Sequence, residues 1–242
     1  MFTQNVKTRR RGRPPGQTVQ GAAARQRLYD IALRLMAKRG YESATLRDVA
    51  KEAGVSVGLL YRYFPSKRAV IIALYEELSA EYARQALDMP RGKWRDRFIF
   101  ALKTSREVLE PHRVALRALI PVLVGNPQEG VFAESAAFSR LRVQRVFEEA
   151  VVGSTDAPVS GLAEAVGRLL YLVHMAVLLW WLLDKSSQQR ATGALVLLTQ
   201  QILPSAALTL RLPPVRRFVI SADALVREAL FDPPSERRGA GR

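Results

Sequence analysis

The chain has 242 residues, of which 48% are hydrophobic and 24% charged, and it carries a formal net charge of +15. This length and composition are ample for a compact core and are compatible with one small and one larger helical domain. The absence of cysteine excludes a disulfide framework and cysteine-ligated metal sites, and it fits a reducing cytoplasm.

Residues 1–21 form a basic, polar arm in which residues 7–16 read KTRRRGRPPG. With no large apolar residue to bury, this arm is expected to be disordered when free, and it does not have the pattern of a secretory signal. Its RGRP segment resembles an AT-hook, in which an extended Arg-Gly-Arg lies in a narrow minor groove. A nonspecific arm that touches phosphates is the alternative. In both cases we expect Arg11 and Arg13 to contact DNA.

Residues 45–67 read TLRDVAKEAGVSVGLLYRYFPSK and predict two short helices joined by a tight turn. Thr45 and Asp48 are three residues apart and can form a capping box at the start of the first helix. Gly54 can take the left-handed conformation that ends it, and Ser56 is a good N-cap for the second helix. Two such helices at a steep angle predict a helix-turn-helix whose second helix enters the major groove of DNA.

The second motif helix should present one face to the core and one to DNA. Leu60 and Phe64 are four residues apart and are expected to point inward. The residues left facing outward are Val57, Gly58, Tyr61 and Arg62. Ser66 then caps a further helix that begins with Lys67, a cation at a position where it opposes the helix dipole. An anion there would resolve this, so Lys67 is a candidate phosphate contact.

Many positions between 25 and 74 follow one family pattern, namely Gly40, Tyr41, Thr45, Arg47, Val49, Ala50, Gly54, Val55, Ser56, Leu60, Tyr61, Tyr63, Phe64 and Lys67. Together they resemble the DNA-binding domain of TetR-family transcriptional regulators. The resemblance implies a symmetric homodimer in which Thr45 and Arg47 meet phosphates or flanking bases. It also implies that Tyr61, Tyr63 and Lys67 grip the DNA backbone. Two-fold symmetry in turn implies a palindromic operator in double-stranded DNA.

The start of the second motif helix departs from the polar readers of that family. Val57, Gly58 and Leu59 offer few hydrogen bonds to base edges, although apolar contacts with thymine methyl groups are available. We therefore expect close approach at Gly58, and contacts from Arg47 and Tyr61, to carry more of the discrimination. The full set of predicted DNA contacts is Arg11, Arg13, Thr45, Arg47, Ser56, Val57, Gly58, Leu59, Tyr61, Arg62, Tyr63 and Lys67.

The positive charge of the chain is concentrated around this motif. Residues 1–70 hold 15 of the 37 Lys and Arg but only 4 of the 22 Asp and Glu. Such clustering supplies the salt-sensitive, sequence-independent part of DNA affinity through counterion release. A structural helix pair in some other helical protein is the alternative, and this distribution of charge argues against it.

Helical patterns account for the rest of the chain, and no alternating strand pattern of useful length appears. They cover residues 22–39, 66–87, 93–110, 113–124, 131–152, 160–183, 188–210 and 215–231. Pro121 and Pro204 are expected to kink or shorten their helices. The pattern predicts an all-α fold with a helix-turn-helix DNA-binding domain at 22–68. A larger helical ligand-binding and dimerisation domain at 69–232 and a loose tail at 233–242 follow.

The most apolar stretch, residues 169–183, is interrupted only by His174 and the hydroxyl of Tyr171. A membrane span needs about 20 such residues, so we favour a helix buried on nearly all sides over membrane insertion. Its copy in another subunit is the expected second partner. In TetR-like proteins the two long helices before the C-terminus pair with their symmetry mates, and here these are residues 160–183 and 188–210.

The resemblance further implies a ligand cavity enclosed by helices within residues 93–183, because regulators of this family are typically released from DNA by a small molecule. Candidate wall residues, for each of which ordinary core is the alternative, are Trp94, Phe98, Leu102, Leu116, Ile120, Phe138, Leu141, Val173, Val177 and Trp180. The aliphatic composition favours an apolar or aromatic effector. Arg113 and Arg117 are four residues apart and are positioned either to hold an anion or to form a solvated face.

His112 and His174 lie on different predicted helices with no carboxylate at metal-ligand spacing, so we expect neither a metal site nor a cofactor. His174 is expected to be a hydrogen-bonded interior residue. Without a Gly-rich phosphate loop, a GxSxG elbow or a cysteine nucleophile, an enzyme is not expected. The predicted function is a cytoplasmic transcriptional repressor that a small molecule releases from its operator. An architectural protein that binds AT-rich DNA through the arm is the alternative.

Overall fold

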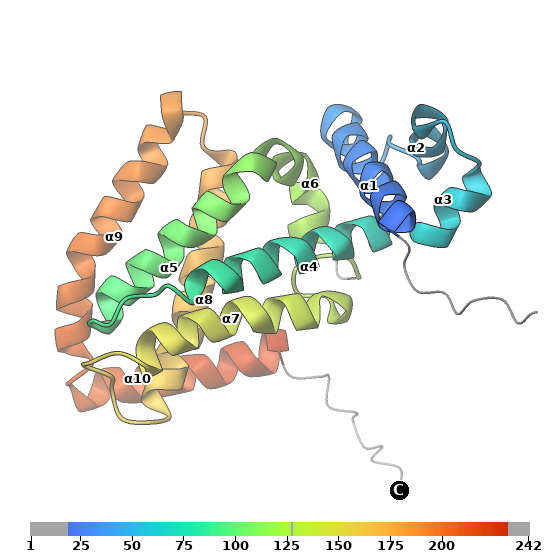
Figure 1. The fold of residues 1–242 in the computed structure, drawn as a ribbon. Coiled ribbons are helices and arrows are strands. Elements are labelled where there is room, and N and C mark those ends of the chain that lie inside the picture. The colour runs from blue at the N-terminus through green and yellow to red at the C-terminus, as the bar shows by residue number, and fades with distance from the viewer. Residues whose placement is uncertain (1–18, 127, 232–242) are drawn as a thin grey trace, which may run out of the picture.

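The computed structural model describes residues 19–126 and 128–231, and every regular element in these ranges is helical. Three helices come first, namely α1 (Val19–Arg39), α2 (Leu46–Ala53) and α3 (Val57–Tyr63). They lie together at one end of the molecule, with α3 at its outer edge (Figure 1). The all-α class and the helix-turn-helix are therefore confirmed. Arg11, Arg13 and the tail at 233–242 lie outside the described residues.

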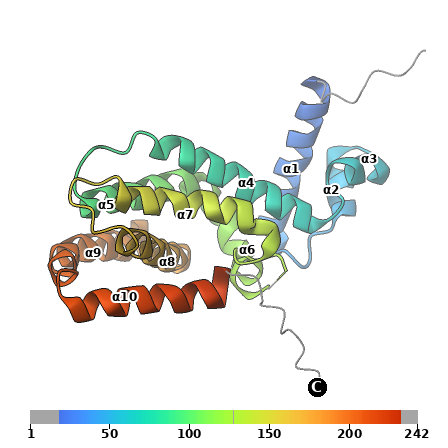
Figure 2. The same ribbon diagram turned by 90° about the horizontal axis from the view of Figure 1, so that it is seen from below.

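The larger part of the molecule consists of seven further helices. These are α4 (Lys67–Ala86), α5 (Trp94–Leu109), α6 (Arg113–Gly125), α7 (Ala137–Val152), α8 (Leu162–Leu183), α9 (Arg190–Thr209) and α10 (Pro213–Val226). A π-helical turn, Arg227–Phe231, continues α10. Helices α4, α5, α7 and α10 run along the body, whereas α8 crosses them (Figure 2). Helix α9 closes the end that is farthest from α1–α3.

One helix boundary differs from the sequence prediction for a local reason. The helix expected from residue 131 begins only at Ala137, after a turn at Asn126 and a short 3-10 helix at Glu134–Ala136. The Asn126 side chain accepts hydrogen bonds from the backbone N–H groups of Gln128 and Glu129, at 2.8 and 3.2 Å. Such side-chain capping competes with helix formation. Helices α6 and α9 continue past Pro121 and Pro204, so neither proline ends its helix.

The core of the larger part is built where α8 crosses α4, α5 and α7. His174 of α8 is buried there, with its ring centroid 4.6 Å from that of Phe147. Its Nε2 lies 2.8 Å from the Ser105 hydroxyl oxygen, which confirms the expected hydrogen-bonded interior position. Burial lowers the pKa of His174 to about 3, so the ring is neutral near pH 7.

Helix α10 is fastened to α8 by a buried ion pair. Arg168 donates from Nε and Nη2 to the two carboxylate oxygens of Asp223, both at 2.6 Å. Both side chains are largely shielded from solvent, and the two parallel bonds give the pair a fixed geometry. The pair therefore fixes α10 against the start of α8.

Two stretches, α8 and residues 187–209, are long and apolar enough to cross a bilayer by length and composition alone. One side of α8 is buried in the core described above, which is typical of a core helix. Neither helix is covered all round, however. Six large apolar side chains, which we call the α8–α9 apolar surface, are 41–64% exposed, namely Val173, Trp180, Leu183, Leu197, Leu198 and Ile202.

Candidate DNA interface and ligand pocket

The geometry of the helix-turn-helix is set by the capping residues expected from the sequence. Thr45 Oγ1 accepts a hydrogen bond from the Asp48 N–H at 3.1 Å, and the Asp48 carboxylate accepts one from the Thr45 N–H at 3.2 Å. These hydrogen bonds from Thr45 hold the pKa of Asp48 below its usual value. Gly54 ends α2 in the left-handed region with φ of 67°, and Ser56 Oγ accepts from the Leu59 N–H at 3.2 Å.

Small side chains let the two motif helices pack closely. Ala50 and Ala53 of α2 are buried, as are Leu60 of α3 and Phe64 directly after it. The ring of Phe64 lies against Tyr29 of α1, with the ring centroids 6.3 Å apart. The predicted inward pair of Leu60 and Phe64 is thus confirmed, and it ties α3 to α1.

The opposite face of α3 is free for a partner. Val57, Gly58, Tyr61 and Arg62 are exposed, with Tyr61 retaining 46% of its accessible surface. A side chain built on Gly58 would meet nothing within 4 Å, so another molecule can approach the backbone there. Arg62 forms no ion pair within the described residues, and nor does Arg47 on α2. An exposed helix face with unpaired guanidinium groups is suited to the major groove and its phosphates.

Three of the predicted DNA contacts also have structural tasks, and those of Tyr63 and Lys67 were not expected from the sequence. The Thr45 hydroxyl donates to Asp48 Oδ2 at 2.7 Å, and Tyr63 is half-buried against the core. Lys67 Nζ donates to the backbone carbonyls of Tyr41 and Glu42, at 2.7 and 3.3 Å. An ammonium group has three donors, so one remains for a phosphate. A DNA contact for each of these residues stays a prediction.

Tyr41 also connects the helix-turn-helix to the larger part of the molecule. Its hydroxyl donates to Glu129 Oε2 at 2.7 Å, and its ring lies 4.4 Å from the Lys67 ammonium nitrogen. Burial and the adjacent Glu129 raise the pKa of the Tyr41 hydroxyl, which therefore remains a donor. Glu129 belongs to the segment between α6 and α7, and α6 in turn packs along α1.

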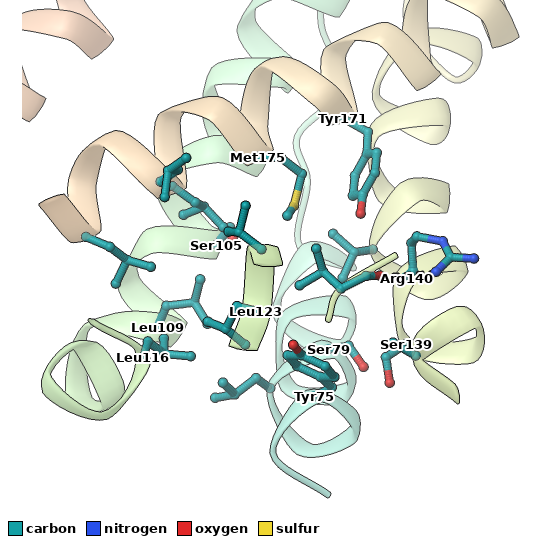
Figure 3. Close-up of a pocket in the computed structure, with 18 of the residues that line it drawn as sticks. Tyr75, Ser79, Ser105, Leu109, Leu116, Leu123, Ser139, Arg140, Tyr171 and Met175 are labelled. Carbon is teal, nitrogen blue, oxygen red and sulfur yellow. Dashed lines mark hydrogen bonds between the residues drawn. The ribbon is translucent and has the colours of Figure 1, made fainter. Parts of the chain in front are cut away.

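A cavity of about 380 Å³ lies between α4, α5, α6, α7 and α8. Figure 3 shows Leu109 and Leu116 at one end and Ser139 and Arg140 at the other, with Met175 projecting from α8 between them. Most of its wall is aliphatic or aromatic, and its volume falls within the range of small-molecule sites. Exposed Phe132, from the segment that follows Glu129, contributes to the wall.

Of the ten predicted wall residues, the structure brings Leu116 and Ile120 to this cavity. Four others are exposed on the far sides of their helices, namely Phe138, Leu141, Val173 and Trp180. Four more are buried in helix packing away from it, namely Trp94, Phe98, Leu102 and Val177. Whether a residue lines the cavity depends on which face of its helix points inward. Trp180 and Trp181 are neighbours about 100° apart around α8, and it is Trp181 that lines the cavity.

The sequence-based prediction missed the contribution of α4 to the wall and placed the wrong face of α7 in it, since Phe138 and Leu141 were expected where Ser139, Arg140 and Val143 lie. Tyr75 and Tyr82 of α4 lie one helical heptad apart, and Arg140 and Phe147 of α7 have the same spacing. This period marks the inward face of a helix, so the position of Arg140 was available as a signal. Arg113, by contrast, donates to the carbonyls of Trp181 and Asp184, which gives it a structural partner. Within the described residues no cluster could hold a metal ion.

Residues 28–74 match the family described as bacterial regulatory proteins, tetR family. The HTH-type transcriptional repressor KstR of Rhodococcus jostii (strain RHA1) is 29% identical over 191 residues, which cover 74% of this chain and 82% of that repressor. The KstR repressor of Mycolicibacterium smegmatis (strain ATCC 700084 / mc(2)155) is 42% identical over 67 residues. These cover 26% of this chain and 33% of that protein.

Solved structures share the fold. A tetR-family transcriptional regulator from Streptomyces coelicolor aligns with a TM-score of 0.57 at 18% identity, covering 84% of this chain and 89% of that one. AibR, whose structure was solved in complex with isovaleryl coenzyme A and operator DNA, aligns with a TM-score of 0.51 at 15% identity. That alignment covers 72% of this chain and 96% of AibR. At these identities the likeness concerns the fold alone.

The exposed face of the motif leads to a direct test. We expect Arg47→Ala and Tyr61→Ala each to weaken DNA binding by about tenfold or more, because each removes a contact to phosphate or base without opening the core. Fluorescence anisotropy over a range of salt concentrations, with circular dichroism for folding, measures this. Lys185→Ala, which removes an exposed cation at the distant end of α8, is the matched control. Wild-type affinity in both motif variants would contradict the assignment.

Proposed function

Because the chain belongs to the TetR family of DNA-binding transcriptional regulators, we propose that it is a repressor whose two copies hold a palindromic operator and release it on binding a small molecule. The observation that carries the proposal is the exposed outer face of α3 with its unpaired arginine, held by caps at Thr45, Gly54 and Ser56. Similarity to the KstR repressor over 82% of that protein's length supports the direction of control. In this proposal residues 22–68 bind DNA, and residues 69–232 bind the effector and the second copy.

The cavity supports control by an effector. It lies in the part of the molecule that does not face DNA, and it has the size and apolar wall of a small-molecule site. AibR, which shares the fold, was solved with both isovaleryl coenzyme A and operator DNA. A ligand can control DNA binding only if it favours one arrangement of the DNA-binding helices over another. We infer that the protein acts in this way without catalysis and without a cofactor, inside the cytoplasm.

The α8–α9 apolar surface supports dimerisation. Exposed apolar side chains gathered on two neighbouring helices are unusual for a monomer and typical of a subunit interface. Pairing these helices with their symmetry mates would bury them in a four-helix arrangement. It would also set the distance between the two copies of α3, which must match successive turns of one face of the duplex.

The route from cavity to DNA runs through the segment between α6 and α7. Val131 and Phe132 line the cavity, and Glu129, two residues before Val131, accepts the Tyr41 hydrogen bond. Tyr41 in turn accepts from Lys67 at the first turn of α4. A ligand that displaces the segment would therefore move the connection between α1 and α2 together with the start of α4. Helix α4 begins at this point and runs along the cavity. Its tilt therefore depends both on the Lys67 contact at its start and on a ligand in the cavity.

Repression is tested by transcription in vitro from a template that carries the operator. We expect the protein to reduce the transcript in proportion to operator occupancy, because a dimer on the duplex obstructs polymerase. A template with a scrambled operator serves as control. An increase in transcript over the same concentration range would make the protein an activator and would contradict repression.

Dimerisation is tested by Leu198→Glu. Placing a carboxylate in the α8–α9 apolar surface should shift the protein to a monomer at micromolar concentration, because the buried charge would lack a partner. Sedimentation velocity measures the change, and operator affinity should fall with it. Leu141→Glu on α7, also an exposed leucine, should remain dimeric. A wild-type protein that sediments as a monomer would rule out the proposed assembly.

The coupling route is tested by Tyr41→Phe and Glu129→Gln. Tyr41→Phe removes the hydrogen bond to Glu129, whereas Glu129→Gln keeps an acceptor and removes the charge that strengthens the bond, and neither leaves a bulky gap. For compounds that raise the Tm of the wild type, we expect the change in operator affinity on ligand binding to shrink in both variants, and more in Tyr41→Phe. The double variant should lose no more than Tyr41→Phe alone, since both act through one bond. Undiminished release in the single variants would refute the route.

A further inference from the structure

Within the wall of the cavity, one charged side chain stands among apolar neighbours. The described lining residues include no Asp, Glu, Lys or His, and Arg140 is their only ionisable group besides tyrosine hydroxyls. Arg140 lies at one end of the cavity beside Ser139, as Figure 3 shows. The opposite end, around Leu109 and Leu116, is aliphatic. The cavity is therefore polar at one end only.

Backbone hydrogen bonds orient the guanidinium group of Arg140, but no carboxylate neutralises its charge. Its Nη1 donates to the backbone carbonyls of Val131 and Ala133, both at 3.1 Å. Its Nε is buried and has no hydrogen-bond partner, and no carboxylate of the described residues lies within ion-pair distance. Two other shielded arginines in this part of the molecule, Arg97 and Arg168, each have a carboxylate partner. Arg113, which does not line the cavity, is held instead by two carbonyls and the ring of Trp181.

An unneutralised cation in an apolar wall is costly, and an arginine cannot discharge by losing its proton. Burial lowers the pKa of Arg140, which shows the direction of this cost, yet the group stays charged at any physiological pH. The two carbonyls hold Nη1, whereas neither Nε nor Nη2 donates a hydrogen bond within the described residues. A carboxylate can accept two parallel hydrogen bonds from these two nitrogens of a guanidinium group. It would supply both the missing negative charge and the missing acceptors.

Two tyrosine hydroxyls in the same wall also lack partners. The hydroxyl groups of Tyr75 and Tyr82, both on α4, are buried without a hydrogen bond. Buried donors are normally satisfied, so these two positions are available to a polar atom of a bound molecule. The hydroxyls of Ser79 and Ser105 are already used, by Arg142 and by His174.

We propose that the cavity binds an apolar molecule that ends in a carboxylate, with the carboxylate on Arg140 and the apolar part directed toward Leu109 and Leu116. The proposal rests on the proposed function, because it names the chemical class of the effector. The sequence predicted an apolar or aromatic ligand, and the proposal adds one anionic group at the end of the ligand that contacts Arg140. Arg140 also donates hydrogen bonds to the carbonyls of Val131 and Ala133, so the carboxylate would be connected through Arg140 to the segment that contains Glu129.

Direct binding tests the site separately from control of DNA. Titration calorimetry of the full chain uses octanoate, dodecanoate, hexadecanoate and biphenylcarboxylate, each beside the primary alcohol of the same skeleton. At least one carboxylate should bind about tenfold or more tightly than its alcohol, since hydrogen bonds to charged groups are worth that much in a shielded site. Arg140→Gln should remove this preference while leaving alcohol binding unchanged, and Arg140→Lys should retain part of it.

Arg145→Gln, which removes an exposed cation of α7 outside the cavity, is the matched control and should keep the preference. Equal binding of acid and alcohol, no binding of any carboxylate, or a preference that survives Arg140→Gln would overturn the proposal. Operator affinity is measured in parallel with the tightest carboxylate. If that ligand binds through Arg140 and leaves DNA binding unchanged, the site stands and effector control fails. If only the alcohols release DNA, control by an effector stands and the carboxylate site fails.

Discussion

The structure depends on one junction, at which Tyr41 donates to Glu129 and accepts from Lys67. These two bonds join the connection between α1 and α2 to the segment before α7 and to the first turn of α4. The DNA-facing helices are therefore connected by hydrogen bonds to elements that contact the cavity. Because hydrogen bonds of this kind are worth only a few kcal/mol, the junction can hold one arrangement firmly and still yield to a ligand.

The two ends of the molecule are built on opposite principles. At α1–α3, short-range caps and small buried side chains produce a rigid unit with an exposed polar face and unpaired cations. At α8 and α9, several large apolar side chains remain exposed because the chain itself does not cover them. The first arrangement suits a charged, wet duplex and the second suits another apolar surface. Because the two surfaces lie far apart, the proposed contacts with DNA and with a second copy would not compete.

The sequence predicted the helix-turn-helix closely because its signals are local. Thr45, Gly54 and Ser56 act within four residues of their own positions, so their roles follow from spacing alone. The cavity was predicted poorly because it depends on which face each helix turns inward, as Trp180 and Trp181 show. The structural contacts of Lys67 could not be predicted for a similar reason. Its carbonyl partners lie about 25 residues earlier in the chain, and no local pattern reveals them.

We propose that α3 reads one defined operator as part of a symmetric dimer. Selection of bound fragments by the full chain from randomised and genomic DNA, repeated at several salt concentrations, tests this. We expect a single two-fold palindrome whose recovery persists as salt rises and nonspecific binding falls. Diffuse enrichment of AT-rich fragments without a palindrome would contradict it, and would assign DNA binding to the basic arm instead.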